Sequence, residues 1–157
     1  MGIKPLLALH SAPDLDPVLD KPLYHKGGFI ILAANLTVSN LIPEEDYINC
    51  VISREMSGTW PLEALKAQAV CARNYYKINL GKHKKHSFDI CATTDCQVYY
   101  GMSQTNNRTT QAASETAGIW VCYQGKLAST FYCASDGGGT EDVRNVWGAR
   151  PTPIFAE

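Results

Sequence analysis

The most regular hydrophobic pattern in the chain lies between residues 61 and 80. Apolar side chains recur there at intervals of three and four, the period of one helix face: Leu62, Leu65, Ala69, Ala72 and Tyr76. Only Lys66 and Gln68 are polar in the two central turns, so the other faces are expected to be buried too. Pro61 suits the first position of a helix and Gly81 suits its C-terminal cap. The pattern therefore predicts a long, mostly buried helix from about Pro61 to Leu80.

A shorter amphipathic helix is predicted before the long one. Pro43 is followed by three acidic residues, 44–46, which favour the positively polarised first turn of a helix. Apolar residues continue at helical spacing as far as Glu55, in the last turn beside the apolar face. Ser57-Gly58 then ends the helix. Glu55 is therefore expected at the junction between two helices.

Shorter hydrophobic runs predict strands and one further helix around this pair. The expected strands span 29–32, 36–39 and 97–100, a more polar helix spans 107–117, and a hairpin joins 119–123 to 127–132 across Gln124-Gly125. Residues 1–22 show no clear period and are expected to form an extended lead-in to one domain, 23–157. No final element is evident after Trp147-Gly148, so the domain is expected to be truncated at its C-terminal end. The order of strands, helices and strands predicts a single α+β domain with antiparallel strands or hairpins.

Length, composition and charge are those of one globular domain. The chain has 157 residues, of which 45% are hydrophobic and 18% are charged, enough for a core of ordinary composition. The formal net charge of −1 argues against nucleic acid as a partner, because such a surface needs a basic excess. No apolar run reaches the roughly eighteen residues of a membrane span. The apolar run at residues 5–9 is also too short for the core of a signal peptide.

The two cations of the long helix need anionic partners. Lys66 and Arg73 are seven residues apart and fall on one stripe, two turns from each other. A cation on a mostly buried helix requires an acidic partner or an anionic ligand. Glu55 and Glu63 are the nearest acids in the sequence. We therefore predict a polar cluster of Glu55, Lys66 and Arg73, which is either a structural ion pair or part of a site.

The six cysteines are expected to be mostly reduced. Cys50, Cys71 and Cys122 lie in apolar runs, where a free thiol behaves as a small hydrophobic side chain. A second group has ligands of the zinc type at close spacing: His83, His86, Cys91 and Cys96. The alternatives are a Cys91–Cys96 disulfide, or two free thiols beside solvated histidines. Asp95, which precedes Cys96, is a further possible oxygen ligand.

A glycine-rich turn follows the expected hairpin. Ser135-Asp136-Gly137-Gly138-Gly139-Thr140 lets backbone N–H groups approach a ligand closely. It is not a phosphate-binding loop, because the lysine and hydroxyl residue that end such a loop are missing.

Several separate motifs, in order along the chain, resemble one known family. They are Glu55-Met56, Trp60-Pro61-x-Glu63-Ala64-Leu65-Lys66-Ala67-Gln68-Ala69-Val70-x-Ala72-Arg73, Phe88-Asp89-Ile90-Cys91, Thr93-Thr94-Asp95-Cys96-Gln97-Val98-Tyr99, Ser135-Asp136-Gly137-Gly138-Gly139-Thr140-Glu141 and Val146-Trp147-Gly148. Over residues 36 to 150 the chain is similar to the stage II sporulation protein D (SpoIID) and amidase-enhancer (LytB) family. The resemblance implies a domain that acts on bacterial peptidoglycan.

The resemblance implies that Glu55 is the catalytic residue of a lytic transglycosylase. One carboxyl group protonates the glycosidic oxygen and then takes a proton from the 6-hydroxyl of muramic acid, which closes a 1,6-anhydro ring. No water is consumed, so the second carboxylate of ordinary glycosidases is not required. Met56 and Trp60 would raise the pKa of Glu55 by desolvation, and Lys66 or Arg73 nearby would lower it. The sequence leaves this balance open, and a structural ion pair is the alternative role for Glu55.

A set of substrate contacts is also expected, because sugars favour aromatic faces and amide hydrogen bonds, although each such residue alone is more often part of a core. Lys66 and Arg73 either contact substrate or hold Glu55. The expected contacts are Lys66, Gln68, Arg73, Gln97, Tyr99, Tyr132, Ser135, Asp136, Gly137, Gly138, Thr140 and Trp147. Asp136 stands where the family more often has a further small residue. It therefore places an unexpected charge beside these contacts.

Some members of the family hold zinc on the stretch that contains His83, His86, Cys91 and Cys96. Many of them have a histidine where this chain has Asp95, so the ligand set is not carried over directly. Such a zinc would be structural, since catalysis by Glu55 requires no cofactor.

Two functions share this motif set. The first is cleavage of peptidoglycan glycan strands, in the sporulation branch strands already stripped of stem peptides. The second is a non-catalytic module that binds peptidoglycan and enhances a partner N-acetylmuramoyl-L-alanine amidase. Either function places the protein outside the cytoplasm, in the cell wall or the intermembrane space of sporulation. An export signal or anchor is therefore expected in a segment absent from this chain. A cysteine hydrolase built on Cys71 or Cys133 is disfavoured, because Cys71 is expected in a buried helix and the histidines in loops.

Overall fold

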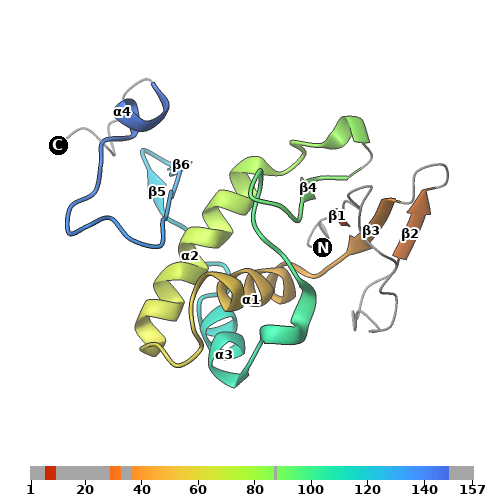
Figure 1. Cartoon of the computed structure of the whole chain (residues 1–157), viewed down its shortest axis with the longest axis horizontal. Helices are drawn as coiled ribbons and strands as arrows, with labels where there is room; N and C mark the ends of the chain where they lie inside the picture. Colours follow the sequence, from red (N-terminus) through yellow and green to blue (C-terminus); the bar gives the residue numbers. More distant parts are fainter. Residues whose placement is uncertain (1–5, 10–28, 33–36, 87, 149–157) are drawn as a thin grey trace.

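The computed structural model describes residues 6–9, 29–32, 37–86 and 88–148. In this part of the chain three helices pack together, a small sheet lies to one side of them, and a hairpin and a short helix lie to the other (Figure 1). In chain order the elements are β1 (Leu6–Leu9), β2 (Phe29–Leu32), β3 (Thr37–Leu41), α1 (Glu44–Glu55), α2 (Leu62–Asn79), the 3-10 helix Lys84–His86, β4 (Ile90–Cys91), the 3-10 helix Gly101–Gln104, α3 (Asn107–Glu115), β5 (Cys122–Tyr123), β6 (Lys126–Leu127) and α4 (Val143–Trp147). The predicted α+β class is confirmed.

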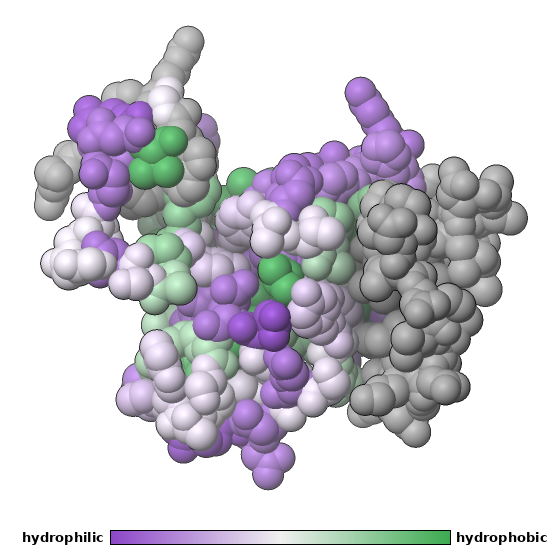
Figure 2. Space-filling model, in the orientation of Figure 1, coloured by the Kyte–Doolittle hydropathy of each residue, from purple (hydrophilic) through white to green (hydrophobic). Residues whose placement is uncertain are grey.

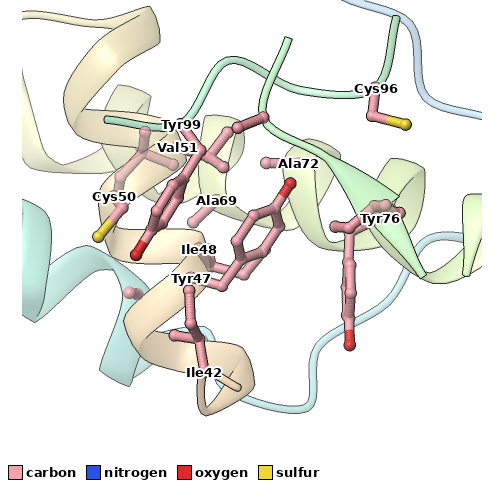
Figure 3. Close-up of a cluster of buried hydrophobic side chains, with 14 of the residues drawn as sticks. Ile42, Tyr47, Ile48, Cys50, Val51, Ala69, Ala72, Tyr76, Cys96 and Tyr99 are labelled. Carbon is pink, nitrogen blue, oxygen red and sulfur yellow. The ribbon is translucent and has the colours of Figure 1, made fainter. Parts of the chain in front are cut away.

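The core forms where α1 meets α2. The fully buried apolar side chains come from the predicted faces of both helices: Tyr47, Ile48, Val51 and Ile52 from α1, and Leu65, Ala69, Ala72 and Tyr76 from α2. Figure 3 shows Tyr47 and Ile48 close to Ala69 and Ala72. Each fully buried isoleucine or leucine contributes about 1.5–3 kcal/mol. This contact fixes α1 and α2 against each other and so places Glu55, at the end of α1.

α3 packs against α1 through hydrogen bonds as well as apolar contact. Asn49 donates from Nδ2 to Thr110 Oγ1 at 2.9 Å, and Ser53 donates from Oγ to Thr109 Oγ1 at 3.2 Å. The side chains that α3 buries are small, so its backbone can approach the other helices closely: Thr109, Ala112 and Ala113. The predicted helix over 107–117 is confirmed, and Gly118 follows it with a φ of 73°.

The sheet has the strand order β2-β3-β1-β4. β3 pairs antiparallel with β2 and with β1, whereas the short strand β4 pairs parallel with β1 and sets Ala8 opposite Cys91. The predicted strands over 29–32 and 36–39 are confirmed as β2 and β3, although β3 runs from Thr37 to Leu41. A strand at Leu6–Leu9 was not expected, since residues 1–22 were read as an extended lead-in without a period. Four residues are too few for an alternation to be recognised, and their strand partners lie more than twenty-five residues away along the chain.

The hairpin is held on α2 by one buried side chain. Asn74 donates from Nδ2 to the carbonyl oxygens of Val121 and Ala128, at 2.7 and 2.9 Å, and its Oδ1 accepts from the Val121 amide at 3.1 Å. The predicted turn is confirmed, with positive φ at Gln124 (48°) and Gly125 (76°). The strands are much shorter than predicted: just beyond them the Ala128 amide still donates to the Val121 carbonyl oxygen at 2.9 Å, and the same two residues also bond to Asn74 of α2.

Two other predictions about elements are wrong in detail. Residues 97–100 contain no strand, and α2 begins at Leu62, with Pro61 in the capping position. The helix α4 was not predicted. It is short, and Asp142 caps its first turn by accepting from the Arg144 amide. Such a helix offers too few residues for a period of 3.6 to be recognised.

The surface of the described residues carries its exposed apolar side chains at scattered positions. Figure 2 shows strong hydrophobic colour only in small patches on the face that it displays. Trp60, Tyr100 and Ile119 are among the larger apolar side chains that are at least half exposed. No helix in the described part of the chain is both long and apolar enough to cross a membrane.

Candidate functional site

Glu55 is the last residue of α1 and its side chain reaches the surface. The pKa of Glu55 is raised above its ordinary value, because partial desolvation of the carboxyl group outweighs the opposing effect of the neighbouring Arg54. The guanidinium of Arg54 lies over the ring of Tyr100, 4.6 Å from its centroid. Among the described residues, no lysine or arginine forms an ion pair with Glu55. The balance that the sequence left open is therefore decided in favour of a raised pKa.

The turn after Glu55 is fastened to the start of α3. Arg108 donates from Nε to the Gly58 carbonyl oxygen at 3.1 Å and from a terminal nitrogen to the Trp60 carbonyl oxygen at 2.8 Å. Gly58 lies so close to Asn106 that a Cβ atom there would be 1.8 Å from its Nδ2. The turn and the start of α3 line an open hollow of about 590 Å³: Ser57, Gly58, Thr59, Asn106, Asn107 and Arg108. The short connection between α1 and α2 is thus held in one position.

The predicted polar cluster of Glu55, Lys66 and Arg73 does not form. Lys66 instead pairs with Glu63 at 2.9 Å and with Glu115 at 2.6 Å, on the side of α2 that faces α3. The prediction was wrong because nearness in sequence favoured Glu55, whereas α3 brings a more distant acid to Lys66. Gln68 is half-buried, and its Nε2 is buried without a hydrogen-bond partner among the described residues.

Arg73 lies in the interior and has no exposed surface. Its guanidinium donates to both carboxylate oxygens of Glu45, at 3.2 and 2.6 Å, and to the Ala113 carbonyl oxygen at 3.2 Å. Thr116 Oγ1 accepts a further, longer bond. A side chain without exposed surface cannot contact a glycan, so the expected substrate contact at Arg73 is wrong. Its partner Glu45 was missed, because no local pattern relates residues twenty-eight positions apart.

The next two expected contacts, Gln97 and Tyr99, are also interior residues, with 4% and 1% of their surface exposed. Tyr99 stacks on Tyr47 with ring centroids 5.7 Å apart, and Figure 3 shows the two hydroxyl groups pointing in opposite directions. Gln97 accepts from the Tyr47 hydroxyl at 3.0 Å and donates from Nε2 to the Tyr132 hydroxyl oxygen at 2.9 Å. Neither Gln97 nor Tyr99 can reach a ligand directly. Tyr132 is half-buried and does reach the surface.

The glycine-rich turn, residues 135–140, is exposed throughout. Gly137 and Gly138 have φ angles of 68° and 96°, which side chains other than glycine rarely adopt. Asp136 accepts from the Gly138 amide at 2.9 Å, so its carboxylate closes this turn locally. Trp147 ends α4.

Four side chains come together where β4 meets the end of α2. The ligand atoms of His83, Cys91, Asp95 and Cys96 all lie within 4.8 Å of one another. His83 Nε2 is 3.2 Å from Cys96 Sγ and 3.2 Å from an Asp95 carboxylate oxygen. Bonds of about 2.0–2.3 Å to a tetrahedral zinc place neighbouring ligand atoms about 3.3–3.8 Å apart. Two thiols, an imidazole and a carboxylate at these separations fit one zinc ion without large movement.

His86 does not belong to this group, so the predicted ligand set is corrected at that position. It lies in the 3-10 helix Lys84–His86, with its ring 6.1 Å from that of Phe88. Asp95 takes the fourth place, and Lys82 pairs with its other carboxylate oxygen at 2.9 Å. All six cysteines are free; Cys50, Cys91 and Cys96 are buried, and Cys122 is exposed although its apolar neighbours predicted burial.

Comparison with known proteins places the chain in a family. The family model described as stage II sporulation protein (SpoIID) matches residues 33–123. An amidase enhancer of Bacillus subtilis is 41% identical over 107 residues, which are 68% of this chain and 14% of that protein. Stage II sporulation protein D of Bacillus amyloliquefaciens is 28% identical over 129 residues, 73% of this chain and 37% of that protein. An uncharacterized protein of Brachyspira hyodysenteriae is 40% identical over 121 residues, 76% of this chain and 33% of that protein.

The chain belongs to the stage II sporulation protein (SpoIID) family. The expected resemblance is therefore confirmed. The chain spans between about a seventh and somewhat more than a third of the curated relatives that it matches.

Proposed function

We propose that this chain is the lytic transglycosylase domain of an extracytoplasmic protein that cleaves the glycan strands of peptidoglycan. The observation that carries the proposal is the environment of Glu55. Its carboxyl group has a raised pKa and is exposed at a helix end, while Lys66 and Arg73 are engaged by other acids. A general acid that works near neutral pH needs such a raised pKa. Membership of the SpoIID family supports the choice of this residue and of the substrate.

In the proposed reaction the protonated Glu55 carboxyl group donates its proton to the glycosidic oxygen as the bond to muramic acid breaks. The sugar ring develops oxocarbenium character, and the carboxylate then accepts a proton from the 6-hydroxyl of the same ring. That oxygen attacks the anomeric carbon and closes the 1,6-anhydro ring. One carboxyl group serves both steps, and neither water nor a metal takes part.

Most of the substrate contacts that remain proposals have exposed or half-buried side chains or backbone: Lys66, Gln68, Tyr132, Ser135, Asp136, Gly137, Gly138 and Thr140. Trp147 also remains a proposal, and its side chain lies outside the described part of the structure. Tyr132 is supported best, because it reaches the surface and the Glu55 carboxylate is among the charges that raise the pKa of its hydroxyl. Zinc at His83, Cys91, Asp95 and Cys96 is proposed as a structural ion, which would hold β4 to the segment after α2.

A second candidate function is a peptidoglycan-binding module that enhances a partner amidase. The 41% identity to the Bacillus subtilis protein named an amidase enhancer favours this alternative. It assigns Glu55 to binding and predicts no new glycan ends. The two functions therefore differ in their products.

The decisive experiment is mass spectrometry of products from glycan strands stripped of stem peptides. The wild-type protein should release fragments ending in 1,6-anhydro-muramic acid, and Glu55→Gln should lower the rate at least about 100-fold, the smaller end of a general acid–base contribution. Glu115→Gln is the matched control, because this exposed acid has a pKa that Lys66 lowers, so it stays ionised and cannot donate a proton near pH 7. Unchanged turnover in Glu55→Gln would refute the assignment. Binding of the strands without any anhydro product would favour the amidase-enhancing module.

A further inference from the structure

The side-chain amide of Gln97 can adopt only one orientation. The carbonyl oxygen of Ala72 is an obligate acceptor and lies 3.2 Å from Gln97 Nε2. The nitrogen must face this carbonyl, because the reverse orientation would oppose two acceptors. Gln97 Oε1 then accepts from the buried Tyr47 hydroxyl at 3.0 Å. Tyr47 on α1 and Ala72 on α2 thus fix both ends of the amide.

The fixed amide determines how the Tyr132 hydroxyl bonds. Gln97 Nε2 is 2.9 Å from the Tyr132 hydroxyl oxygen, and an amide nitrogen can only donate. The Tyr132 oxygen therefore accepts, and its own proton is left for another acceptor. Gln97 is the only hydrogen-bond partner of the Tyr132 hydroxyl in the described part of the chain. The hydroxyl is thus a donor whose acceptor is not among these residues.

The segment that carries Tyr132 is held firmly against α2. Thr130 donates to the Cys71 carbonyl oxygen at 2.8 Å, and the Tyr132 ring packs edge-on against Tyr75, with centroids 6.5 Å apart. Burial raises the pKa of Tyr132 to about 12, and the Glu55 carboxylate contributes in the same direction. The hydroxyl therefore keeps its proton near neutral pH.

We propose that the Tyr132 hydroxyl donates a hydrogen bond to a glycan oxygen beside Glu55, and that Gln97 is the positioning residue that keeps it a donor. The class of ligand rests on the proposed function. The chain Tyr47–Gln97–Tyr132 connects the core of the helix pair to the surface where that ligand binds. Gln97 acts through Tyr132 and does not touch the glycan itself.

The test measures binding in a Glu55→Gln background, which prevents turnover. The probe is a tetrasaccharide of alternating N-acetylglucosamine and N-acetylmuramic acid, titrated by calorimetry. Tyr132→Phe should weaken binding about tenfold, the loss of one hydrogen bond. Tyr75→Phe is the matched control and should change the dissociation constant less than about twofold, because it removes the hydroxyl of a neighbouring ring that is not bonded to Gln97.

Gln97→Glu separates positioning from a general structural effect. A carboxyl group carries at most one proton, and the Ala72 carbonyl requires it, so Tyr132 must donate to residue 97 in either protonation state. Gln97→Glu should therefore weaken binding about as much as Tyr132→Phe, and it should add nothing in the Tyr132→Phe background. Gln97→Met, which keeps the volume and removes both amide donors, is the second variant should Gln97→Glu fold poorly. It too should have no effect in the Tyr132→Phe background.

The results separate this proposal from the proposed catalysis. Three results would each overturn the proposal. The changes at positions 97 and 132 could weaken binding additively, Tyr132→Phe could leave binding unchanged, or the Glu55→Gln protein could show no measurable binding. The predicted non-additive pattern, together with wild-type protein that releases no anhydro product, would support the donor role and refute the catalytic role of Glu55.

Discussion

Arg73→Ala is expected to destabilise the protein strongly without acting on a ligand. The guanidinium is wholly buried and holds Glu45, at the start of α1, to Ala113 and Thr116, at the end of α3. Its removal therefore breaks a buried polar connection that joins all three packed helices. The substitution also leaves an empty space beside α2, because alanine lacks most of the volume of arginine.

The magnitude follows from what is left behind. The Glu45 side chain is 36% exposed, so water can solvate much of its charge again, and the orphaned acid accounts for only part of the loss. The buried Ala113 carbonyl loses the guanidinium donor and keeps a bond from Thr116 Oγ1 at 3.3 Å, so this loss lies toward the lower end of the cost of about 1–3 kcal/mol for an unsatisfied buried group. Breaking a buried ion pair by removing one partner typically costs about 3–5 kcal/mol. Because Glu45 is partly exposed, we expect a loss near the lower end of that range, about 3 kcal/mol.

Urea unfolding followed by circular dichroism measures this loss as a shift in the midpoint at unchanged slope. Lys77→Ala is the matched control on the same helix. Lys77 pairs with Glu44 at 3.2 Å at a partly exposed position, so its loss should cost less than about 1 kcal/mol. A loss below about 1 kcal/mol for Arg73→Ala as well would refute the reasoning, because it would mean that the guanidinium is not holding the helices together.

Three further predictions concern other sites. Because the folded state holds the proton of Glu55 more tightly than the unfolded chain does, this group stabilises the fold below the ordinary glutamate pKa and loses that contribution as the pH rises through its raised folded value. The melting temperature of Glu55→Gln relative to that of wild type should therefore increase as the pH rises, and a decrease would show that the pKa is lowered. Purified under reducing conditions, the protein should hold about one zinc per chain and lose thermal stability when the zinc is chelated. Asp95→Ala should lose the zinc and His86→Ala should keep it. Loss of zinc from His86→Ala but not from Asp95→Ala would restore the ligand set expected from the sequence. Gly58→Ala should lower the free energy of unfolding by about 1 kcal/mol, because the new methyl group displaces the Asn106 amide that caps α3. Gly139→Ala has open space around the new methyl group and should change it by less than about 0.5 kcal/mol. Equal effects of the two substitutions in urea unfolding would contradict the close approach of Gly58 to Asn106.

The helices were predictable because their information is local. The apolar spacing from Leu62 to Tyr76 gives α2, and Pro43 with the acids after it gives the start of α1. The two ends of each helix lie within a few residues of the positions expected from these signals. The family motifs also lie in short stretches, which is why membership could be expected before the structure. The strands β4 and β1 were missed, because their pairing depends on residues far away in the sequence.

The candidate site was predictable only in part. The sequence by itself identified Glu55 at a helix end, and it brought the two cysteines and His83 into one candidate metal group. Which fourth side chain joins that group depended on the tight turn before Cys96, where the Cys96 amide donates to the Thr93 carbonyl oxygen at 3.0 Å and Asp95 is carried toward the thiols.

The tertiary structure alone decided the electrostatics of Glu55. Sequence distance made Lys66 and Arg73 its expected partners. In the folded protein, α3 supplies Glu115 to Lys66, and the first turn of α1 supplies Glu45 to Arg73. With both cations neutralised elsewhere, partial desolvation dominates and the pKa of Glu55 rises. Helix periodicity is set by neighbours along the chain, whereas the partner of a buried charge is set by which helices meet in space.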